Sequence, residues 1–432
     1  MLQNGKTSRL PNFFRLEPGE RIEVVRNLAD LTREEGWILK KEHLHLETAE
    51  SMIENVLGVF GLPLGLAVNF RINERDYLVP MAVEESSVVA ASSNASKLVR
   101  EYGTLEARAD DPLMIGQIQV AGLEASDLDG AASRVEEASR ELLETAAKQD
   151  PVLVERGGGP RAVEVRRVET REGPFLVIHL LVDTRDAMGA NAVNSMAEAL
   201  APAIEALTGG TVLCRILSNL ADRRLVHATA SVRREGLARG DFDGAEVARR
   251  ISQASALAEA DPYRAATHNK GVMNGIDAVL IATGNDWRAV EAGAHAFASR
   301  AGSYTALASW TVEGETLTGR MTLPLAIGTV GGAAAFHPAA RICRKILGIS
   351  SARELAEVVA AAGLVQNLAA LRALVTDGIQ KGHMELHARN VAVNAGAFGD
   401  MVTSVAKQMV REGRIRFDRA KEILAQRLKS KP

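Results

Sequence analysis

The chain has 432 residues, enough for two or three domains, and its 51 basic and 54 acidic residues leave a net charge of −3. No basic run stands out, so the composition argues against a nucleic-acid partner. The two cysteines, Cys214 and Cys343, lie far apart, which is typical of a reduced, cytoplasmic compartment. The sequence begins without an apolar signal core, and no segment approaches the roughly 18 continuous apolar residues of a membrane helix, so we expect no membrane partner.

The first hundred residues predict two helices followed by a hairpin. Residues 18–31 and 44–57 carry apolar side chains at helical spacing. Two apolar strands then follow, joined by a turn at residues 73–76, and they lead into a loop that holds Glu84 and Glu85.

The next hundred residues predict a compact unit of alternating strands and helices. The predicted strands are 115–122, 163–168, 174–183 and 211–218, and the predicted helices are 131–148 and 188–207. The strand at 174–183 is continuously apolar and should therefore be central. The order β-α-β-β-α-β is that of a ferredoxin-like unit.

From residue 244 onward the pattern is mostly helical. One hairpin interrupts it, with its turn near Glu313–Gly314. Helices are predicted at 351–361, 364–375, 379–388, 394–411 and 417–428. Gly396 and Gly399 would form a hinge before the last two helices.

The segment 261–288 carries the strongest chemical signal, because Lys270 lies among glycines and small or apolar residues. Burial lowers the pKa of a lysine and a nearby carboxylate raises it, so a lysine buried in such a segment must be paired. The pattern alone leaves two readings open, a structural ion pair and a working electrophile.

Three further motifs each allow a plain and a functional reading. The turn at 185–191 enters a helix whose first N–H groups could bind a phosphate, with Asp186 as a helix cap or a ribose ligand; the plainer reading is an N-cap followed by small packing residues. Glu84 and Glu85 could include a proton donor of raised pKa, or be one solvated glutamate and one surface pair. His383 and His387 share a helix face, but no third ligand is near, so we expect no metal and interpret them as a general acid or surface histidines.

Taken in order, the motifs resemble the soluble, bacterial class II branch of the 3-hydroxy-3-methylglutaryl-CoA (HMG-CoA) reductases over nearly the whole chain. The matching segments are MIENVLG at 52–58, VPMAVEESSVVAA at 79–91, RDAMGAN at 185–191, RILSNLADRRL at 215–225, the segment 261–296, GTVGGAA at 328–334 and GIQKGHMELHARN at 378–390. The resemblance implies a four-electron reduction of a thioester to an alcohol, with two hydrides supplied in turn by two reduced nicotinamides.

The resemblance also implies roles for individual residues. Lys270 would stabilise the oxyanion that each hydride addition creates, and Glu85 would donate the proton. Asp286 would link these two in one hydrogen-bonded network, and His383 would protonate the departing CoA thiolate.

Binding roles follow from the same resemblance. The cofactor contacts would be Asp186, Met188, Gly189, Ala190 and Asn191. Ser87, Arg264 and Asn274 would hold the carboxylate and hydroxyl groups of the substrate. Asp150, just before the glycines at 157–159, would accept from a ribose 2′-OH and repel a 2′-phosphate, so NAD(H) is expected and NADP(H) is less expected.

The fold that the resemblance implies is α+β, with a large and mostly helical substrate-binding domain at residues 1–111 and 220–375. An inserted ferredoxin-like NAD-binding domain would occupy 112–219, and residues 376–432 would form a C-terminal flap that carries His383. Active sites would form between two subunits, so at least a homodimer is expected. We expect interconversion of HMG-CoA with mevalonate and CoA, in either the biosynthetic or the catabolic direction. The rival hypotheses are a non-redox acyl-CoA hydrolase or lyase, and a non-catalytic CoA-binding protein.

Overall fold

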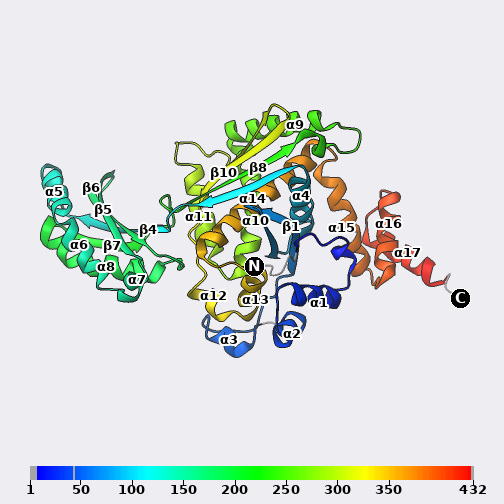
Figure 1. The fold of residues 1–432 in the computed structure, drawn as a ribbon, viewed down its shortest axis with the longest axis horizontal. Helices are drawn as coiled ribbons and strands as arrows, with labels where there is room; N and C mark the ends of the chain where they lie inside the picture. Colours follow the sequence, from blue (N-terminus) through cyan, green and yellow to red (C-terminus); the bar gives the residue numbers. More distant parts are fainter. Residues whose placement is uncertain (1–6, 42–43, 430–432) are drawn as a thin grey trace.

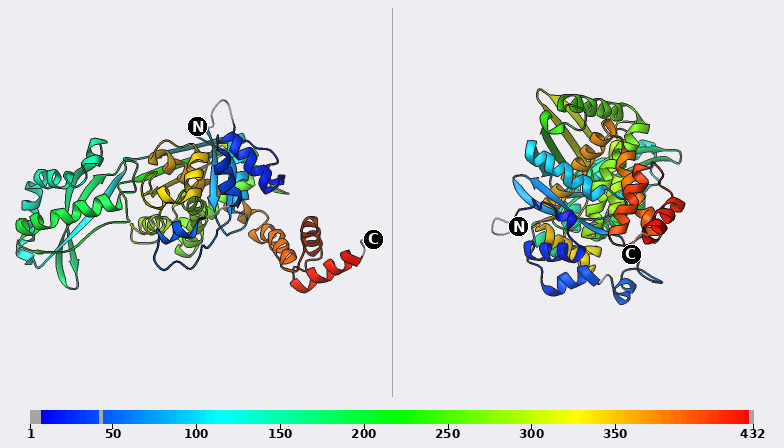
Figure 2. Two further views of the ribbon diagram at one scale, coloured as in Figure 1. Left: turned by 90° about the horizontal axis from the view of Figure 1, so that it is seen from below. Right: turned by 90° about the vertical axis from the view of Figure 1, so that its right-hand side faces the viewer.

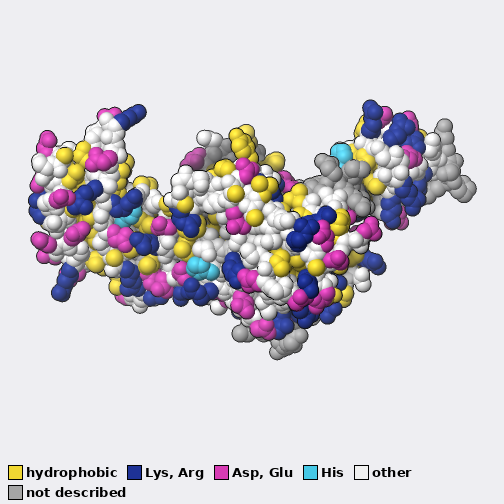
Figure 3. All heavy atoms as spheres, turned by 90° about the horizontal axis from the view of Figure 1, so that it is seen from above, with side chains coloured by type: hydrophobic (Ala, Val, Ile, Leu, Met, Phe, Trp, Pro, Cys, Tyr) yellow, Lys and Arg dark blue, Asp and Glu magenta, His cyan; other side chains and the backbone are white. Residues whose placement is uncertain are grey.

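The computed structural model describes residues 7–41 and 44–429, without the side chains at 333–334, 379–386 and 428–429. Three parts lie along the longest axis of the molecule (Figure 1): a small α/β unit at one end, a large central body, and a group of C-terminal helices at the other end. On the face shown in Figure 3, basic and acidic side chains are interspersed, as the balanced composition suggests.

The N-terminal part contains three short helices and a β-hairpin. The elements are α1 (Pro18–Leu28), α2 (Arg33–Lys41), α3 (Leu46–Glu50), β1 (Leu64–Ile72) and β2 (Arg75–Ala82). The antiparallel pairing of β1 with β2 confirms the predicted hairpin. The prediction of a helix over 44–57 was wrong beyond Glu50: the apolar side chains of Ile53 and Leu57 are exposed, so no core stabilises a further helical turn.

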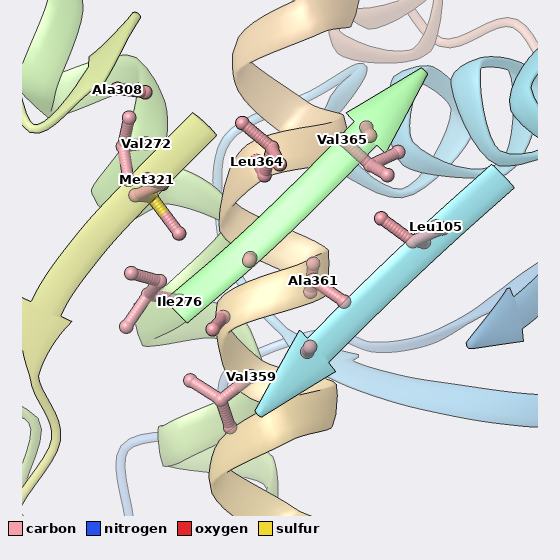
Figure 4. Packing of buried hydrophobic residues seen from close by; sticks show 14 of the residues in the cluster. Leu105, Val272, Ile276, Ala308, Met321, Val359, Ala361, Leu364 and Val365 are labelled. Atoms are coloured by element: carbon pink, nitrogen blue, oxygen red, sulfur yellow. The ribbon is translucent and has the colours of Figure 1, made fainter. Parts of the chain in front are cut away.

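The central body is built around a four-stranded antiparallel sheet of order β3-β8-β10-β9. Its strands are β3 (Gly103–Ala109), β8 (Leu225–Arg233), β9 (Ala308–Glu313) and β10 (Thr316–Pro324); the pair β9–β10 confirms the predicted second hairpin. The surrounding helices are α4 (Val88–Tyr102), α9 (Gly244–Ala260), α10 (Pro262–Thr283), α11 (Trp287–Ala298), α12 (Gly332–Phe336), α13 (Pro338–Leu347) and α14 (Ala352–Val375). Figure 4 shows α14 packing Val359, Ala361 and Leu364 against the sheet and α10.

Helix α14 is continuous, so the prediction of two helices at 351–361 and 364–375 was wrong. Gly363 causes no break, because it lies where α14 packs against Ile276 of α10. By length and composition α14 could cross a membrane, a property that the sequence analysis overlooked, but 67% of its most apolar window is buried inside the protein. Its apolarity is therefore explained by its place in the core.

The small unit has the predicted ferredoxin-like topology, with an antiparallel sheet of order β5-β6-β4-β7. The strands are β4 (Leu113–Ala121), β5 (Gly159–Thr170), β6 (Gly173–Asp183) and β7 (Thr211–Leu217), and β6 is central as predicted. The helices are α5 (Leu128–Glu137), α6 (Ser139–Ala147), α7 (Pro151–Glu155) and α8 (Ala190–Thr208). The single helix predicted at 131–148 is therefore two helices, which divide at Ala138. This unit has its own hydrophobic core, separate from that of the central body.

The C-terminal helices are α15 (Ile379–Asn394), α16 (Asp400–Arg411) and α17 (Phe417–Lys429), and they project away from the central body (Figure 2). They form a third, small hydrophobic core among themselves. The helix predicted at 394–411 begins only at Asp400, because Gly396 and Gly399 adopt positive φ at the corner between α15 and α16.

Candidate active site

A cavity of about 490 Å³ opens between the N-terminal end of α4 and the helices α10 and α14. It collects predicted site residues from two separated parts of the sequence: Glu85 and Ser87, then Arg264, Lys270 and Asn274. Helix α10 supplies three of them, because its apolar side chains face the core while Lys270 and Asn274, four residues apart, share the opposite face.

Lys270 and Glu85 form an ion pair in this cavity. Asn274 Nδ2 lies 3.4 Å from Glu85 Oε1, so the amide holds the second oxygen of the same carboxylate. The Lys270 side chain is 58% exposed, which corrects the expectation of a buried lysine. An accessible ammonium group that is held by one carboxylate can also reach a ligand in the cavity.

The loop before α4 is strained at Ser87, two residues after Glu85. Ser87 precedes the first residue of α4 with φ 78° and ψ −18°, a left-handed conformation that is uncommon outside glycine. Such outliers persist where the surrounding structure imposes them, and they cluster at functional sites. The strain therefore fits the predicted role of Ser87 beside the substrate.

Arg264 lies in the first turn of α10, and no acidic partner pairs with its guanidinium among the described residues. Burial lowers the pKa of Arg264. Burial and the neighbouring Arg264 together lower the pKa of His268 to about 4, so His268 is neutral near pH 7. The cavity therefore presents one uncompensated cation, which suits an anionic ligand.

The sequence analysis missed two amide side chains in the cavity wall, Gln366 and Asn367 of α14. Both are nearly fully buried. The sequence did contain a signal, since Gln366 and Asn367 are adjacent polar residues within an otherwise apolar helical segment. A polar group that is buried in such a helix needs a defined hydrogen-bond partner.

The structure does not bring Asp286 to the Lys270–Glu85 pair within one chain. Asp286 is the N-cap of α11, where it accepts from Ala289 N at 3.1 Å and pairs with Arg288 at 3.4 Å. It lies beyond the C-terminal end of α10, and the 13 residues of helix after Lys270 span roughly 20 Å. His383 lies in α15, and its side chain is outside the described residues.

The turn at 185–191 forms a second cluster, away from the cavity. Gly189 is the N-cap of α8 with φ 97°, and a Cβ there would lie 2.2 Å from Thr184 Cγ2, so only glycine fits. The first residues of α8, Ala190 and Asn191, thus begin a helix whose N–H groups are left open to an anion. This open backbone fits the phosphates of a dinucleotide.

Buried contacts anchor this turn to the central body. The fully buried Arg224 donates to Thr184 Oγ1 and to the carbonyl groups of Ala187, Met188 and Ile327. The Asp186 carboxylate accepts from Ala352 N at 2.7 Å. Asp186 therefore caps α14, which corrects the expectation that it caps the helix following its own turn.

Asp150 and two arginines surround the glycine loop at 157–159. Asp150 is the N-cap of α7 and accepts from Leu153 N at 2.9 Å. Arg161 and Arg185, which the sequence analysis did not select, both donate to the carbonyl group of Gly157 and both pair with Asp183. Among the side chains that the structure describes, no group of three or more His, Cys, Asp or Glu gathers as metal ligands would.

The sequence is similar to known proteins over most of its length. The family model for hydroxymethylglutaryl-coenzyme A reductase matches residues 17–388. The 3-hydroxy-3-methylglutaryl-coenzyme A reductase of Archaeoglobus fulgidus is 50% identical over 430 residues, covering 99% of this chain and 97% of its own. A probable reductase of the same name from Borreliella burgdorferi is 36% identical over 344 residues, covering 79% of this chain and 77% of its own.

Solved structures give the same result for the fold. The class II reductase of Streptococcus pneumoniae, bound to NADPH in open conformations, matches with a TM-score of 0.81 at 44% identity, covering 85% of this chain and 99% of that one. A second structure of the Streptococcus pneumoniae enzyme covers 96% of this chain and 99% of that one, with a TM-score of 0.82 at 42% identity.

The protein combines a mixed α+β fold with a cavity that holds an unpaired arginine and a glycine turn at the N-terminus of α8. This combination fits an oxidoreductase that uses a nicotinamide cofactor. The chain belongs to the hydroxymethylglutaryl-coenzyme A reductase family, in its class II branch. Its substrate is HMG-CoA, and its reaction belongs to the mevalonate pathway.

Proposed function

We propose that the Lys270–Glu85 pair is the catalytic centre of this reductase and that the enzyme prefers NAD(H). The observation that carries the proposal is an accessible lysine, held by one carboxylate, in a cavity that also contains the uncompensated Arg264. An HMG-CoA acyl group has a carboxylate at one end and the reacting thioester at the other. Arg264 would bind the first, and Lys270 would lie at the second.

The residues of this centre would act on the substrate as follows. The bound nicotinamide supplies the hydrides. Lys270 Nζ donates to the thioester oxygen and stabilises the negative charge that develops on it, first in the thiohemiacetal and then in the alkoxide. Glu85 would take up a proton from solvent and pass it to the alkoxide by way of Lys270, which it contacts. Ser87 and Asn274 would orient the hydroxyl and carboxylate groups, and His383 would protonate the CoA thiolate when α15 approaches.

For the cofactor, the supporting observation is Gly189, where a Cβ would lie 2.2 Å from Thr184 Cγ2, so that only glycine allows the turn that leads into the N-terminus of α8. The dinucleotide would contact Met188, Gly189, Ala190 and Asn191. Asp186 would hold the turn in place through its hydrogen bond to the start of α14. Asp150 would favour NAD(H) by accepting from the ribose 2′-OH. A preference for NAD(H) favours the oxidative, catabolic direction, from mevalonate and CoA to HMG-CoA.

We also propose a division of the chain, supported by the separate hydrophobic clusters of the central body, the small unit and the C-terminal helices. Residues 1–111 with 220–375 would form the substrate domain and 112–219 the cofactor domain. Residues 376–432 would form a flap that closes over the substrates and excludes water. The protein would act in the cytoplasm as at least a homodimer.

The test is nicotinamide absorbance at 340 nm, with mevalonate plus CoA and NAD or NADP in turn, and with HMG-CoA and each reduced cofactor. Turnover with NAD well above that with NADP is expected. Asp150→Ser is the sharper variant, because serine keeps the N-cap of α7 while removing the charge. It should raise kcat/KM for NADPH about tenfold or more relative to NADH. A wild-type preference for NADP would discard the NAD(H) proposal, and no turnover by folded protein would discard the catalytic centre.

A further inference from the structure

The C-terminal helices are joined to the central body by a very short connection. Helix α14 ends at Val375, and α15 begins at Ile379. The residue before α15, Gly378, has φ 77° and ψ 155°, a conformation that is almost restricted to glycine. Among the described side chains, the hydrophobic cluster of the C-terminal helices contains only residues from Ala388 onward. The direction in which these helices project (Figure 2) therefore depends on how the connection is held.

The end of α14 is fixed firmly to the central body. Arg372, in the last turn of α14, donates through Nε to the carbonyl oxygen of Leu237 at 3.2 Å and through Nη2 to that of Ala238 at 2.8 Å. From α9, Arg250 Nη1 donates to the carbonyl oxygen of Val375 at 3.2 Å. The end of α14 is thus tied both to the loop after β8 and to α9, so a movement of the flap must begin beyond it.

The loop after β8 also supplies an arginine that holds the connection itself. Arg239 Nε donates to Asp377 Oδ2 at 2.6 Å, a short contact between opposite charges. The backbone of Arg239 is held in a tight turn, where it exchanges hydrogen bonds of 3.0 and 3.1 Å with Phe242. The guanidinium of Arg250 lies over the Phe242 ring, 4.3 Å from its centroid. Arg239 is therefore a fixed point, and it holds the residue directly before Gly378.

This ion pair confines the pivot of the flap to one residue. Asp377 is held from the central body, and Gly378 is the next residue, with the backbone freedom of a glycine. Arg239, Asp377 and Gly378 all line the substrate cavity, so the pivot lies beside the site that the flap would cover. His383 follows five residues after Gly378, or roughly 7 Å along α15. A misplacement of about 1 Å can cost on the order of a hundredfold in rate, so a shifted pivot would misplace any acid that α15 carries.

We propose that the Arg239–Asp377 ion pair fixes the pivot of the flap, so that α15 brings His383 to the sulfur of CoA. The inference rests on the proposed flap and on the proposed role of His383. Hydride addition to the thioester gives a thiohemiacetal. When its alkoxide collapses, the C–S bond breaks and leaves mevaldehyde and a CoA thiolate, which takes a proton from His383. Arg239 is then a positioning residue, because it acts through Asp377 and not on the reacting atoms.

The experiment compares two substrates, HMG-CoA and free mevaldehyde, with the same reduced cofactor. Arg239→Met should lower kcat for HMG-CoA about fivefold or more, because protonation of the thiolate becomes slower. It should change kcat for mevaldehyde less than about twofold, because that reduction leaves no thiolate to protonate. The lost ion pair is partly exposed, so the unfolding temperature should stay within about 2 °C of wild type.

Matched variants show whether the ion pair carries the effect. Asp377→Asn should lower kcat for HMG-CoA to a similar extent, and the double variant of Arg239→Met with Asp377→Asn should lose no more than either single variant. Arg239→Lys keeps a cation opposite Asp377 and should retain at least about half of the wild-type kcat. Arg320→Met is the control, because it removes the 2.7 Å ion pair with Glu313 on the hairpin β9–β10 and should change neither activity.

The outcomes separate this inference from the proposed site. His383→Gln should show the same difference between the two substrates, with a larger loss. If His383→Gln slows both reductions alike, the role proposed for His383 is wrong and the inference falls with it. If His383→Gln acts as expected while Arg239→Met slows both reductions alike, or neither, the ion pair does not position the flap. A rise in KM for HMG-CoA above about fivefold at constant kcat would make Arg239 a ligand of CoA and overturn the proposal.

Discussion

At the scale of single residues, the proposed chemistry depends on a lysine that is paired without being buried. The neighbours of Lys270 in the sequence are small and apolar, but they belong to the other faces of α10. The lysine itself lies at the open side of the helix, beside Glu85. Its ammonium group is open to solvent and held by one carboxylate, so a ligand in the cavity can reach it.

Replacing this cation should affect catalysis far more than folding. Lys270→Met is expected to lower kcat about 10²- to 10³-fold, the usual effect of removing one oxyanion-stabilising donor. The unfolding temperature should change little, because exposed ion pairs contribute about 1 kcal/mol or less. Steady-state reduction of HMG-CoA and differential scanning calorimetry measure the two effects. Lys97→Met removes a comparably exposed lysine of α4 and serves as the control; a kcat loss for Lys270→Met below about fivefold would exclude the catalytic role.

At the scale of elements, the spacing of apolar residues predicted the helices and strands whose apolar side chains pack against other parts of the same chain. The hairpins β1–β2 and β9–β10 and the ferredoxin-like order of strands were all predictable, because alternation and turn residues fix them locally. The predicted helix over 44–57 failed where its apolar residues have no core to pack on. The division of α14 failed for the opposite reason, since Gly363 serves helix packing and does not end the helix.

The site was predictable to a similar extent. Residues on one helix, such as Lys270 and Asn274, could be placed together from their spacing. Two other contacts could not be predicted, the anchoring of the 185–191 turn by Arg224 and the capping of α14 by Asp186. Arg224 lies 103 residues before Ile327, and Asp186 lies 166 residues before Ala352. Neither helix periodicity nor strand alternation contains that information.

The turn at 185–191 gives a prediction about cofactor binding. In Gly189→Ala, a methyl group would lie against Thr184 in a backbone conformation of φ 97°, so the turn must change shape. The dissociation constant for NADH should rise at least about tenfold, with a destabilisation on the order of 1–3 kcal/mol. Fluorescence titration with NADH measures the first and thermal unfolding the second. Gly209→Ala is the control, because Gly209 also has positive φ, at the end of α8, but faces open space. Equal NADH affinity in the wild-type protein and Gly189→Ala would remove the turn from the cofactor site.

The contact between α10 and α11 predicts a pH dependence of stability. Burial, followed by a hydrogen bond to Glu291, raises the pKa of Asp277 to about 8. The folded state therefore holds a proton that the unfolded chain releases above about pH 4. The stabilising effect is complete below that pH and is lost as the pH rises toward 8.

Asp277→Asn removes this titration, because the amide stays neutral at every pH. The variant should unfold at a temperature close to that of wild type at pH 5, and about 2 °C or more above wild type at pH 8. Calorimetry across this range measures the difference. A difference that stays constant with pH would show that Asp277 does not titrate in this window.

At the scale of the whole molecule, a single chain exposes more surface than a compact protein of its size. Its accessible area is 21777 Å², whereas a compact monomer of 46.2 kDa exposes roughly 16,000 Å². Part of the excess follows from the elongated arrangement of three parts (Figure 2). Another part is apolar: Ile53, Leu57 and Phe60 lie exposed in the segment between α3 and β1. Apolar side chains gathered in this way are typical of a surface that a second subunit covers.

The proposed catalytic residues also lie in two separate places on one chain. Glu85, Lys270 and Arg264 line the cavity. Asp286 lies near the 185–191 turn instead, because its neighbour Asn285 accepts from Gly328 N and Gly328 packs against the backbone of that turn. If Asp286 acts on the Lys270–Glu85 pair, it must come from another copy of the chain, since its own copy holds it roughly 20 Å away along α10. Each complete site would then need one half from each of two subunits.

Mixing two inactive variants distinguishes a shared site from a site within one chain. Lys270→Met and Asp286→Asn should each be nearly inactive alone. After the two are unfolded together and refolded as dimers, a mixed dimer contains one site with both substitutions and one site with neither. Random pairing makes half of the dimers mixed, so activity should return to about a quarter of the wild-type value. If both residues act within one chain, every site carries one substitution and no activity returns, and sedimentation of the mixture confirms that dimers were present in either case.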